Sequence, residues 1–191
     1  MAATTGSTVS LNPKIDPIER RPAPGIVILR PAVPADLTHL RRWDRDPDVR
    51  GSLVDSDWQW DTELHKNPAW REWLIAVVDG RPIGFIQIID PEHEETKYWG
   101  CMKAGHRAID IWIGEPDARN RGYGAQMMEQ AIERSFAEPS VHTILIDPLE
   151  ANTRAHRFYE RLGFEFVVQR DFHGDQCRVY RLRRPGSTPS H

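Results

Sequence analysis

The residues best suited to chemistry form a glycine-rich turn at residues 119–125, with the sequence Arg-Asn-Arg-Gly-Tyr-Gly-Ala. Gly122 and Gly124 stand at alternate positions, so successive backbone N–H groups can point into one concavity. A helix that starts here would add the partial positive charge of its N-terminus. Arg119 and Arg121 supply full charges beside it. The turn therefore predicts a site for phosphate oxygens.

The spacing in this turn differs from two common phosphate-binding motifs. The dinucleotide-binding pattern needs a third glycine, and the nucleoside-triphosphate loop needs Gly-Lys-Ser/Thr. The turn has neither. Taken alone, it is equally consistent with a structural connection between a strand and a helix.

Asp110 is a second candidate, because it interrupts an apolar strand predicted at residues 108–113. Ile109, Ile111 and Ile113 would share one face of this strand, and Asp110 would lie on the other face with Trp112. Burying an unpaired carboxylate is costly, so Asp110 needs a partner. That partner could belong to the protein or to a cationic substrate.

Carboxylates and tryptophans are concentrated in the first part of the chain. All seven tryptophans precede residue 113, and Trp58, Trp60, Trp99 and Trp112 are interleaved with acidic residues. Such a mixture suits a polycationic, ring-containing ligand, but an ordinary solvated acidic surface is the alternative; Trp70 and Trp73 are expected in the core. The acidic residues are Asp44, Asp46, Asp48, Asp55, Asp57, Asp61, Glu63, Asp90, Glu92, Glu94 and Glu95.

The elements that must position these residues follow from apolar periodicity and turn signals. We expect a mixed α/β (α+β) sheet with helices packed on its faces. Residues 90–106 lack a period and predict a long loop. Helices are expected at residues 36–43, at 61–70 with a weaker pattern, after Gly124, and after an Asn152 cap; strands are expected at residues 26–29, 73–78, 83–89, 108–113, 141–146, 165–170 and 177–182.

Length and composition limit the classes of protein. The 191 residues are 39% hydrophobic with a net charge of −3, which predicts one domain over residues 26–184 between a flexible arm (1–25) and a flexible tail (185–191). There is no membrane-spanning run or signal pattern, so a cytoplasmic monomer or homodimer is expected. No basic footprint for nucleic acid is present. Neither the two cysteines nor the histidines have metal-ligand spacing, so no metal is expected.

The order of motifs resembles the GNAT superfamily of acyl-coenzyme A dependent N-acetyltransferases, over about residues 26–184. After the turn and a strand at 141–146 comes Asn152-x6-Tyr159-Glu160-Arg161-Leu162-Gly163-Phe164. The resemblance implies acetyl-CoA as cosubstrate. It also implies a GNAT fold, with a central mixed sheet whose parallel strands at 108 and 141 splay apart and with helices on both faces.

The same resemblance implies roles for individual residues. Arg119 and the backbone amides of Arg121, Gly122, Tyr123, Gly124 and Ala125 would hold the pyrophosphate. Ile111, Trp112 and Ile113 would line the pantetheine arm, with main-chain groups of Ile111 and Ile113 facing the arm and the acetyl carbonyl; Asn152 would bind the arm. Tyr159 would protonate the leaving sulfur, although an ordinary core aromatic would also fit its helical spacing.

A closer likeness is to the aminoglycoside 6'-N-acetyltransferases. It lies in Trp73-Leu74-Ile75-Ala76, in residues 80–87 and 107–110, and in Ile146-Asp147-Pro148. It implies that Asp110 binds the amine to be acetylated, as ammonium ligand or general base, that Asp147 binds another amino group, and that Gln87 binds a hydroxyl or amine. Trp58, Trp99, Asp55 and Asp57 are further substrate-binding candidates.

Other functions remain open at this stage. A siderophore-pathway enzyme that acylates a lysine-like amine would share the strand order and the Tyr-Glu-Arg-x-Gly-Phe end. A protein lysine acetyltransferase would also use this fold, and a non-catalytic acyl-CoA sensor would bind the cosubstrate without transfer. The sequence leaves open which amines are accepted.

Overall fold

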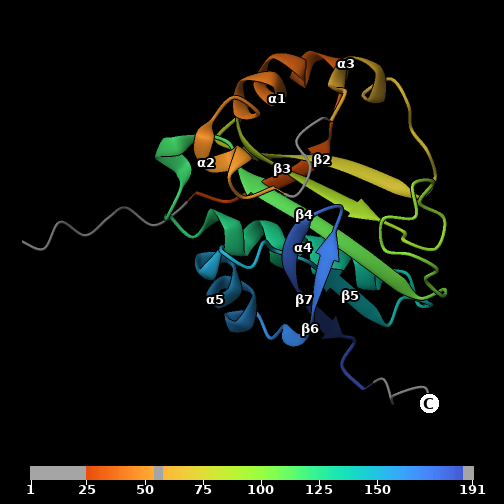
Figure 1. Ribbon diagram of the computed structural model, residues 1–191. Helices are drawn as coiled ribbons and strands as arrows, with labels where there is room; N and C mark the ends of the chain where they lie inside the picture. Colours follow the sequence, from red (N-terminus) through yellow and green to blue (C-terminus); the bar gives the residue numbers. More distant parts are fainter. Residues whose placement is uncertain (1–24, 54–57, 187–191) are drawn as a thin grey trace, which may run out of the picture.

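The computed structural model describes residues 25–53 and 58–186, and the fold is built on one mixed sheet (Figure 1). Its strands run in the order β1-β2-β3-β4-β5-β7-β6, with one parallel pair, β4 and β5. Their bounds are β1 Ile28–Pro31, β2 Arg71–Val78, β3 Arg81–Ile89, β4 His106–Ile113, β5 Thr143–Ile146, β6 Glu165–Phe172 and β7 Asp175–Arg183.

The two main helices lie where the sequence predicts them. Asn152 caps α5 by accepting the Ala155 amide at 3.0 Å, and Gly163 follows the helix with φ +88°. The α-helices are α1 Leu37–Trp43, α2 Pro47–Arg50, α3 Trp60–Glu63, α4 Tyr123–Ala137 and α5 Thr153–Arg161; two short 3-10 helices, η1 and η2, span Pro34–Asp36 and Pro116–Ala118.

One predicted helix is much shorter than expected. The sequence suggests a helix over 61–70, but α3 ends at Glu63. The Asn67-Pro68 step disfavours helical backbone and removes an N–H donor. The freed segment instead leads into β2, so that Trp70 and Arg71 lie beside a pocket described below.

The helices cover both faces of the sheet, as predicted (Figure 1). On one face, Met127 and Met128 of α4 and Tyr159 of α5 pack with Ile109 of β4. On the other, aromatic residues of the sheet pack against α1 and α3. The alternation predicted for β4 is confirmed, because Trp112 belongs to this second cluster.

The parallel pair β4–β5 separates partway along its length. The strands pair over only three positions, from His106 with Thr143 to Ala108 with Leu145. β4 then continues for five more residues along β3, up to Ile113 opposite Gly84. A gap therefore opens in the middle of the sheet, and this confirms the predicted splay.

The predicted end segments lie almost wholly outside the described residues, which begin at residue 25 and end at 186. Within the described ranges, no helix is both long and apolar enough to cross a bilayer.

Candidate active site

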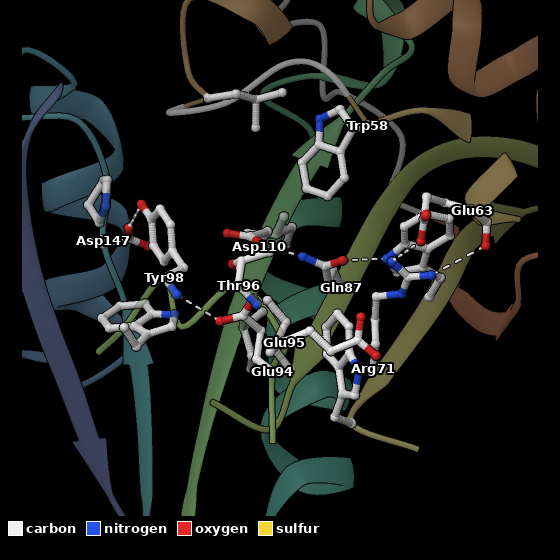
Figure 2. Close-up of a pocket in the computed structure, with 18 of the residues that line it drawn as sticks. Trp58, Glu63, Arg71, Gln87, Glu94, Glu95, Thr96, Tyr98, Asp110 and Asp147 are labelled. Carbon is white, nitrogen blue, oxygen red and sulfur yellow. Dashed lines mark hydrogen bonds and ion pairs between the residues drawn. The ribbon is translucent and has the colours of Figure 1, made fainter. Parts of the chain in front are cut away.

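A pocket of about 460 Å³ lies at the gap between β4 and β5 (Figure 2). Its walls come from both faces of the sheet: Trp73 and Asp110 from the α1/α3 face, Ile109 and Tyr159 from the α4/α5 face. The pocket brings together eight residues to which the sequence analysis gave a binding or catalytic role, namely Trp58, Gln87, Trp99, Asp110, Ile111, Asp147, Asn152 and Tyr159. The gap therefore gives two reactants access to one place from opposite sides of the sheet.

Asp110 is held by a row of side chains across three strands. In the strand register Trp73 lies opposite Gln87 and Gln87 opposite Asp110, and directly opposed side chains are in contact range. The Trp73 indole N–H donates to Gln87 Oε1, and Gln87 Nε2 donates to Asp110 Oδ2 at 2.9 Å. Because both ends of the amide are engaged, Gln87 fixes the orientation of the carboxylate.

A second carboxylate lies across the gap, directly after β5. Asp147 Oδ2 accepts a hydrogen bond from the Tyr98 hydroxyl at 2.5 Å. Tyr98 comes from the predicted long loop, and nothing in the local sequence pattern singled it out. Asp110 on β4 and Asp147 just after β5 thus face the same pocket (Figure 2).

Burial changes the pKa values of these groups, and the charge of Asp110 adds to the change at Asp147. Burial raises the pKa of Asp110 to about 6, against the smaller opposing effect of the Gln87 hydrogen bond. Burial and the Asp110 charge raise the pKa of Asp147 well above its usual value. Burial also raises the pKa of the Tyr159 hydroxyl, and the two carboxylates add to the rise. The site is therefore short of positive charge, and Tyr159 keeps its proton at neutral pH.

Aromatic rings form one wall above Asp110. The Trp58 ring stacks on Trp60 at 5.2 Å and contacts Trp112 at 5.2 Å. Trp58 is half-buried, whereas Trp60 and Trp112 are buried. Of the three rings, Trp58 is the one that lines the pocket. Trp112 thus supports Trp58 through its side chain.

Trp99 also contributes mainly to packing. It is 5% exposed, and its ring lies 5.3 Å from Phe172 in a small third cluster, although part of it lines the pocket.

The main chain of β4 explains how Ile111 and Ile113 could face a ligand in the gap. The Gly114 amide donates to the Ile83 carbonyl on the β3 side. Main-chain groups alternate along a strand, so those of Ile109, Ile111 and Ile113 point toward the opposite edge. Beyond Ala108 that edge has no pairing with β5.

The glycine-rich turn forms the N-terminus of α4. Gly122 is the N-cap with φ +84° and offers no side chain to the first-turn amides. The Ala125 amide donates to the Gly122 carbonyl at 3.2 Å, whereas the amides at the very start of a helix have no carbonyl one turn before them to bind. A Cβ on Gly124 would meet nothing closer than 3.7 Å, and its φ is not positive. The fold does not require a glycine at position 124. A ligand that approached the backbone closely at this position would require one. These features fit a pyrophosphate.

Arg119 and Arg121 differ in their surroundings. Arg119 binds Asp46 at 2.8 Å and Asp48 at 2.7 Å, and it donates to the Ile113 carbonyl at 3.1 Å. Its side chain therefore joins the end of β4 to α2. Arg121 is exposed, with its guanidinium 5.9 Å from the Tyr123 ring.

Much of the early acidic cluster is paired within the protein. Asp44 accepts from the Trp60 indole and Asp61 pairs with Arg41. Glu63 lines the pocket but binds Arg71 at 2.9 Å. The acidity of the pocket therefore rests mainly on Asp110, Asp147 and the loop residues Glu94 and Glu95. The candidates Asp55 and Asp57 lie outside the described residues.

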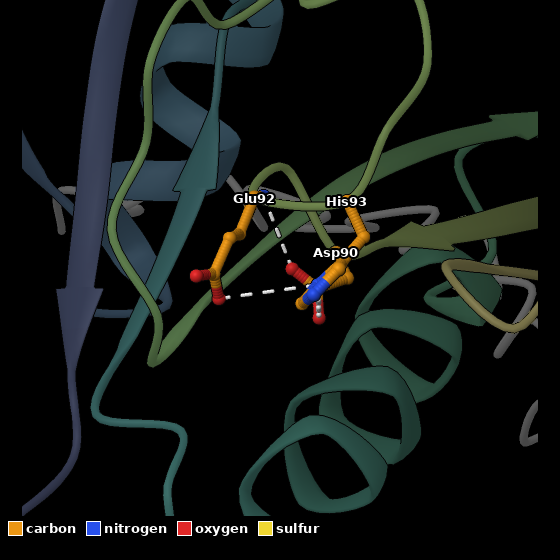
Figure 3. A group of neighbouring side chains, drawn as sticks. All are labelled: Asp90, Glu92 and His93. Carbon is orange, nitrogen blue, oxygen red and sulfur yellow. Dashed lines mark hydrogen bonds and ion pairs between the residues drawn. The ribbon is translucent and has the colours of Figure 1, made fainter.

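Three possible metal ligands, Asp90, Glu92 and His93, lie together (Figure 3). One oxygen or nitrogen each from Asp90, Glu92 and His93 lies within 4.8 Å of the others. The Arg107 guanidinium forms an ion pair with Asp90 at 3.2 Å, so Asp90 already has a cationic partner within the protein. None of these three residues lines the pocket at the gap.

A family model described as an acetyltransferase (GNAT) domain matches residues 32–172. The chain belongs to the GNAT acetyltransferase family. An aminoglycoside N(6')-acetyltransferase type 1 from Klebsiella pneumoniae is 28% identical over 129 residues, which make up 67% of this chain and 64% of that protein. The chain thus spans just under two thirds of that relative's length.

Other relatives match over longer stretches. A lysine N-acyltransferase from Mycolicibacterium paratuberculosis is 26% identical over 185 residues, covering 88% of this chain and 80% of that protein. The crystal structure of aminoglycoside acetyltransferase AAC(6')-Ib with coenzyme A superimposes with a TM-score of 0.73 at 24% identity, covering 83% of this chain and 95% of the other. The structural match demonstrates the shared fold.

Proposed function

We propose that this GNAT protein transfers the acetyl group of acetyl-CoA to a primary amine of a polycationic small molecule, with the 6'-amino group of aminoglycosides as the first candidate. The observation that carries the proposal is the pocket at the splayed strands. There, two carboxylates of raised pKa lie beside a half-buried tryptophan face. Carboxylates and an aromatic face are what a cationic ring compound needs for ion pairs and cation–π contacts.

Acetyl-CoA would lie along the α4 end of the gap. The backbone amides of residues 121–125 would hold its pyrophosphate, and the open edge of β4 at Ile111 and Ile113 would bind its arm. When bound, acetyl-CoA supplies the activated acetyl group. Gly124 leaves room for it at the start of α4.

The residues of this chain would orient the reactants and move one proton. Asp110, fixed by Gln87, would hold the substrate ammonium, and its pKa of about 6 makes it a stronger base than an ordinary aspartate. Direct attack requires the amine to lose a proton, which we assign to water beside Asp110. Tyr159 keeps its proton at neutral pH and would donate it from its hydroxyl to the leaving sulfur.

A second candidate is acylation of a lysine-like small molecule. Its support is the lysine N-acyltransferase relative, whose match covers more of both chains than the aminoglycoside-acetylating relative does. Such a substrate carries a carboxylate as well as an amine. Arg71 and Lys66 line the far end of the pocket, although both bind Glu63.

Thiol release from acetyl-CoA, measured with kanamycin, spermine and lysine, tests the proposal. We expect amine-dependent release with kanamycin, and mass spectrometry should place the acetyl group on the 6'-nitrogen. Turnover of lysine with little turnover of kanamycin would support the second candidate. Coenzyme A binding without release by any amine would contradict catalysis and indicate an acyl-CoA sensor.

A further inference from the structure

The contact between Tyr98 and Asp147 has no part in the reaction described above. The hydroxyl donates to Asp147 Oδ2 at 2.5 Å and joins the 90–105 loop to the end of β5 (Figure 2). Both residues are half-buried and line the pocket. The bond therefore acts on a carboxylate that a substrate can reach.

Packing holds the Tyr98 ring independently of its hydroxyl. The ring stacks on Phe172 with centroids 4.5 Å apart and planes 9° from parallel. It also meets the edge of Trp99 at 5.8 Å. A phenylalanine at position 98 can keep these contacts and lose only the hydrogen bond.

The backbone beneath Tyr98 is fixed by a buried carboxylate. Glu94 is 5% exposed. It accepts from the Thr96 amide at 2.7 Å and from the Tyr98 amide at 2.8 Å. This turn gives the loop a defined shape, so the hydroxyl is directed at Asp147 by backbone and ring together.

The charges around Asp147 explain what this hydrogen bond contributes. Burial and the like charge of Asp110 both favour the protonated form of Asp147, whereas the hydrogen bond from the Tyr98 hydroxyl favours the ionised form of Asp147. A protonated Asp147 would bind an ammonium group weakly. The ionisable groups that face Asp147 are Tyr98 from the loop, Asp110 from β4, Tyr159 from α5, Arg170 from β6 and Cys177 from β7.

We propose that Tyr98 is a specificity-determining residue, whose hydroxyl holds Asp147 as an oriented carboxylate for a second ammonium group while the first lies at Asp110. The pocket then favours amines with two or more ammonium groups over monoamines. This inference deepens the proposed function and rests on it for the identity of the Asp110 ligand. Tyr98 acts through Asp147 and is a positioning residue.

The test compares Tyr98→Phe with the wild-type protein in binding 1,6-diaminohexane and hexylamine, with kanamycin as a larger polyamine. Quenching of tryptophan fluorescence reports binding without acetyl-CoA, since Trp58 and Trp73 line the pocket. We expect Tyr98→Phe to weaken 1,6-diaminohexane and kanamycin about tenfold, as for a hydrogen bond to a charged group, and hexylamine less than about twofold. The pH midpoint of diamine binding should move upward.

A double-mutant cycle with Asp147→Asn separates this role from a structural one. Asp147→Asn alone should weaken the diamine and spare hexylamine, and adding Tyr98→Phe should then have no further effect. The proposal would be overturned if Tyr98→Phe weakened the binding of both amines equally, or if its effect persisted in the Asp147→Asn background. It would also be overturned if the wild-type protein bound no polyamine. Tyr98-dependent diamine binding without acetyl transfer would instead refute the proposed function alone.

Discussion

Asp110 lies in a strand whose neighbouring odd-numbered residues are isoleucines, and its partner within the protein is an amide rather than a cation. The sequence left two interpretations of this carboxylate open. A raised pKa and a place in the pocket favour the one in which the substrate supplies the positive charge.

Replacing this carboxylate should affect the amine and leave the cosubstrate alone. For Asp110→Asn we expect kcat/KM for the amine to fall about a hundredfold or more, because the ammonium loses its ion pair and the water that takes the amine proton loses the carboxylate beside it. The Kd of acetyl-CoA, measured by calorimetry, should change less than about twofold. A similar loss in kcat/KM for the amine and in affinity for acetyl-CoA would contradict the role of Asp110 as the amine ligand.

Protonation of Asp110 should also determine how kcat/KM falls at acid pH. In the wild type kcat/KM should fall below about pH 6, where Asp110 takes up a proton. Asp110→Asn should show no break at that pH in its residual activity.

The same carboxylate should reduce stability at neutral pH. Its folded pKa of about 6 lies above the unfolded value of about 3.9. The folded state therefore holds more protons between these values, and the free energy of unfolding decreases as pH rises through this window. We expect Asp110→Asn to raise the Tm at pH 7.5 by about 3–6 °C and to leave it unchanged near pH 3.5. An unchanged Tm at both values would argue against the raised pKa.

At the scale of elements, the sequence predicted the order of strands and helices well, because period-2 and period-3.6 patterns and turn residues are local signals. The sequence did not predict contacts that depend on how neighbouring strands pair. A two-residue Asp79-Gly80 turn alone would set Trp73 opposite Ile86. A bulge in β3 next to Pro82 shifts the register and places Gln87 there. Tyr98 was missed for a similar reason, since a loop carries no period and its contact with Asp147 spans 49 positions.

The start of α4 offers a test in which folding and binding should respond differently. Gly124→Ala has room in the protein and should keep the Tm within about 2 °C, because Ala favours helix over Gly. It should weaken coenzyme A binding at least tenfold, as judged by calorimetry, if the ligand backbone approaches here. Gly122→Ala is the matched control: at φ +84° it should lower the free energy of unfolding by about 1 kcal/mol. Unchanged coenzyme A affinity in Gly124→Ala would contradict the cradle.

Arg119 should act as a structural link between α2 and the end of β4. Its side chain is 13% exposed and binds two aspartates. Arg119→Ala should lower the free energy of unfolding by about 1–3 kcal/mol, as measured by urea denaturation. Asp46→Ala should cost a similar amount. If Arg119→Ala changed coenzyme A affinity without changing stability, Arg119 would be a phosphate ligand instead.

Across the whole molecule, the net charge of −3 conceals an uneven distribution. Acidic side chains remain available in the pocket, whereas Arg121, Arg154 and Arg157 are exposed near the start of α4 or on α5. A polycation and an anionic cosubstrate would therefore approach different surfaces. Composition could suggest this division, but not which acidic residues stay unpaired.

A polyamine should stabilise the fold in a pH-dependent way. Kanamycin at about a hundred times its Kd should raise the Tm by about 5–10 °C at pH 8. At pH 5 the rise should be less than half of this, because Asp110, with a pKa of about 6, is then largely protonated, and the raised pKa of Asp147 favours its neutral form as the pH falls. Differential scanning fluorimetry at both values checks this, and equal shifts would exclude the carboxylates as the binding groups.

The separation of β4 from β5 also bears on mechanics. Among the described residues, the register of β4 with β5 joins the four-stranded part of the sheet, β1 to β4, to the three-stranded part, β5 to β7, through three residue pairs. A ligand whose arm bonds to the open edge of β4 would act as a missing strand and tie the two parts together. Backbone amides at residues 109–113 that face the gap should then exchange with deuterium quickly in the free protein and become protected when coenzyme A is bound, so that the cosubstrate completes the sheet on which it reacts.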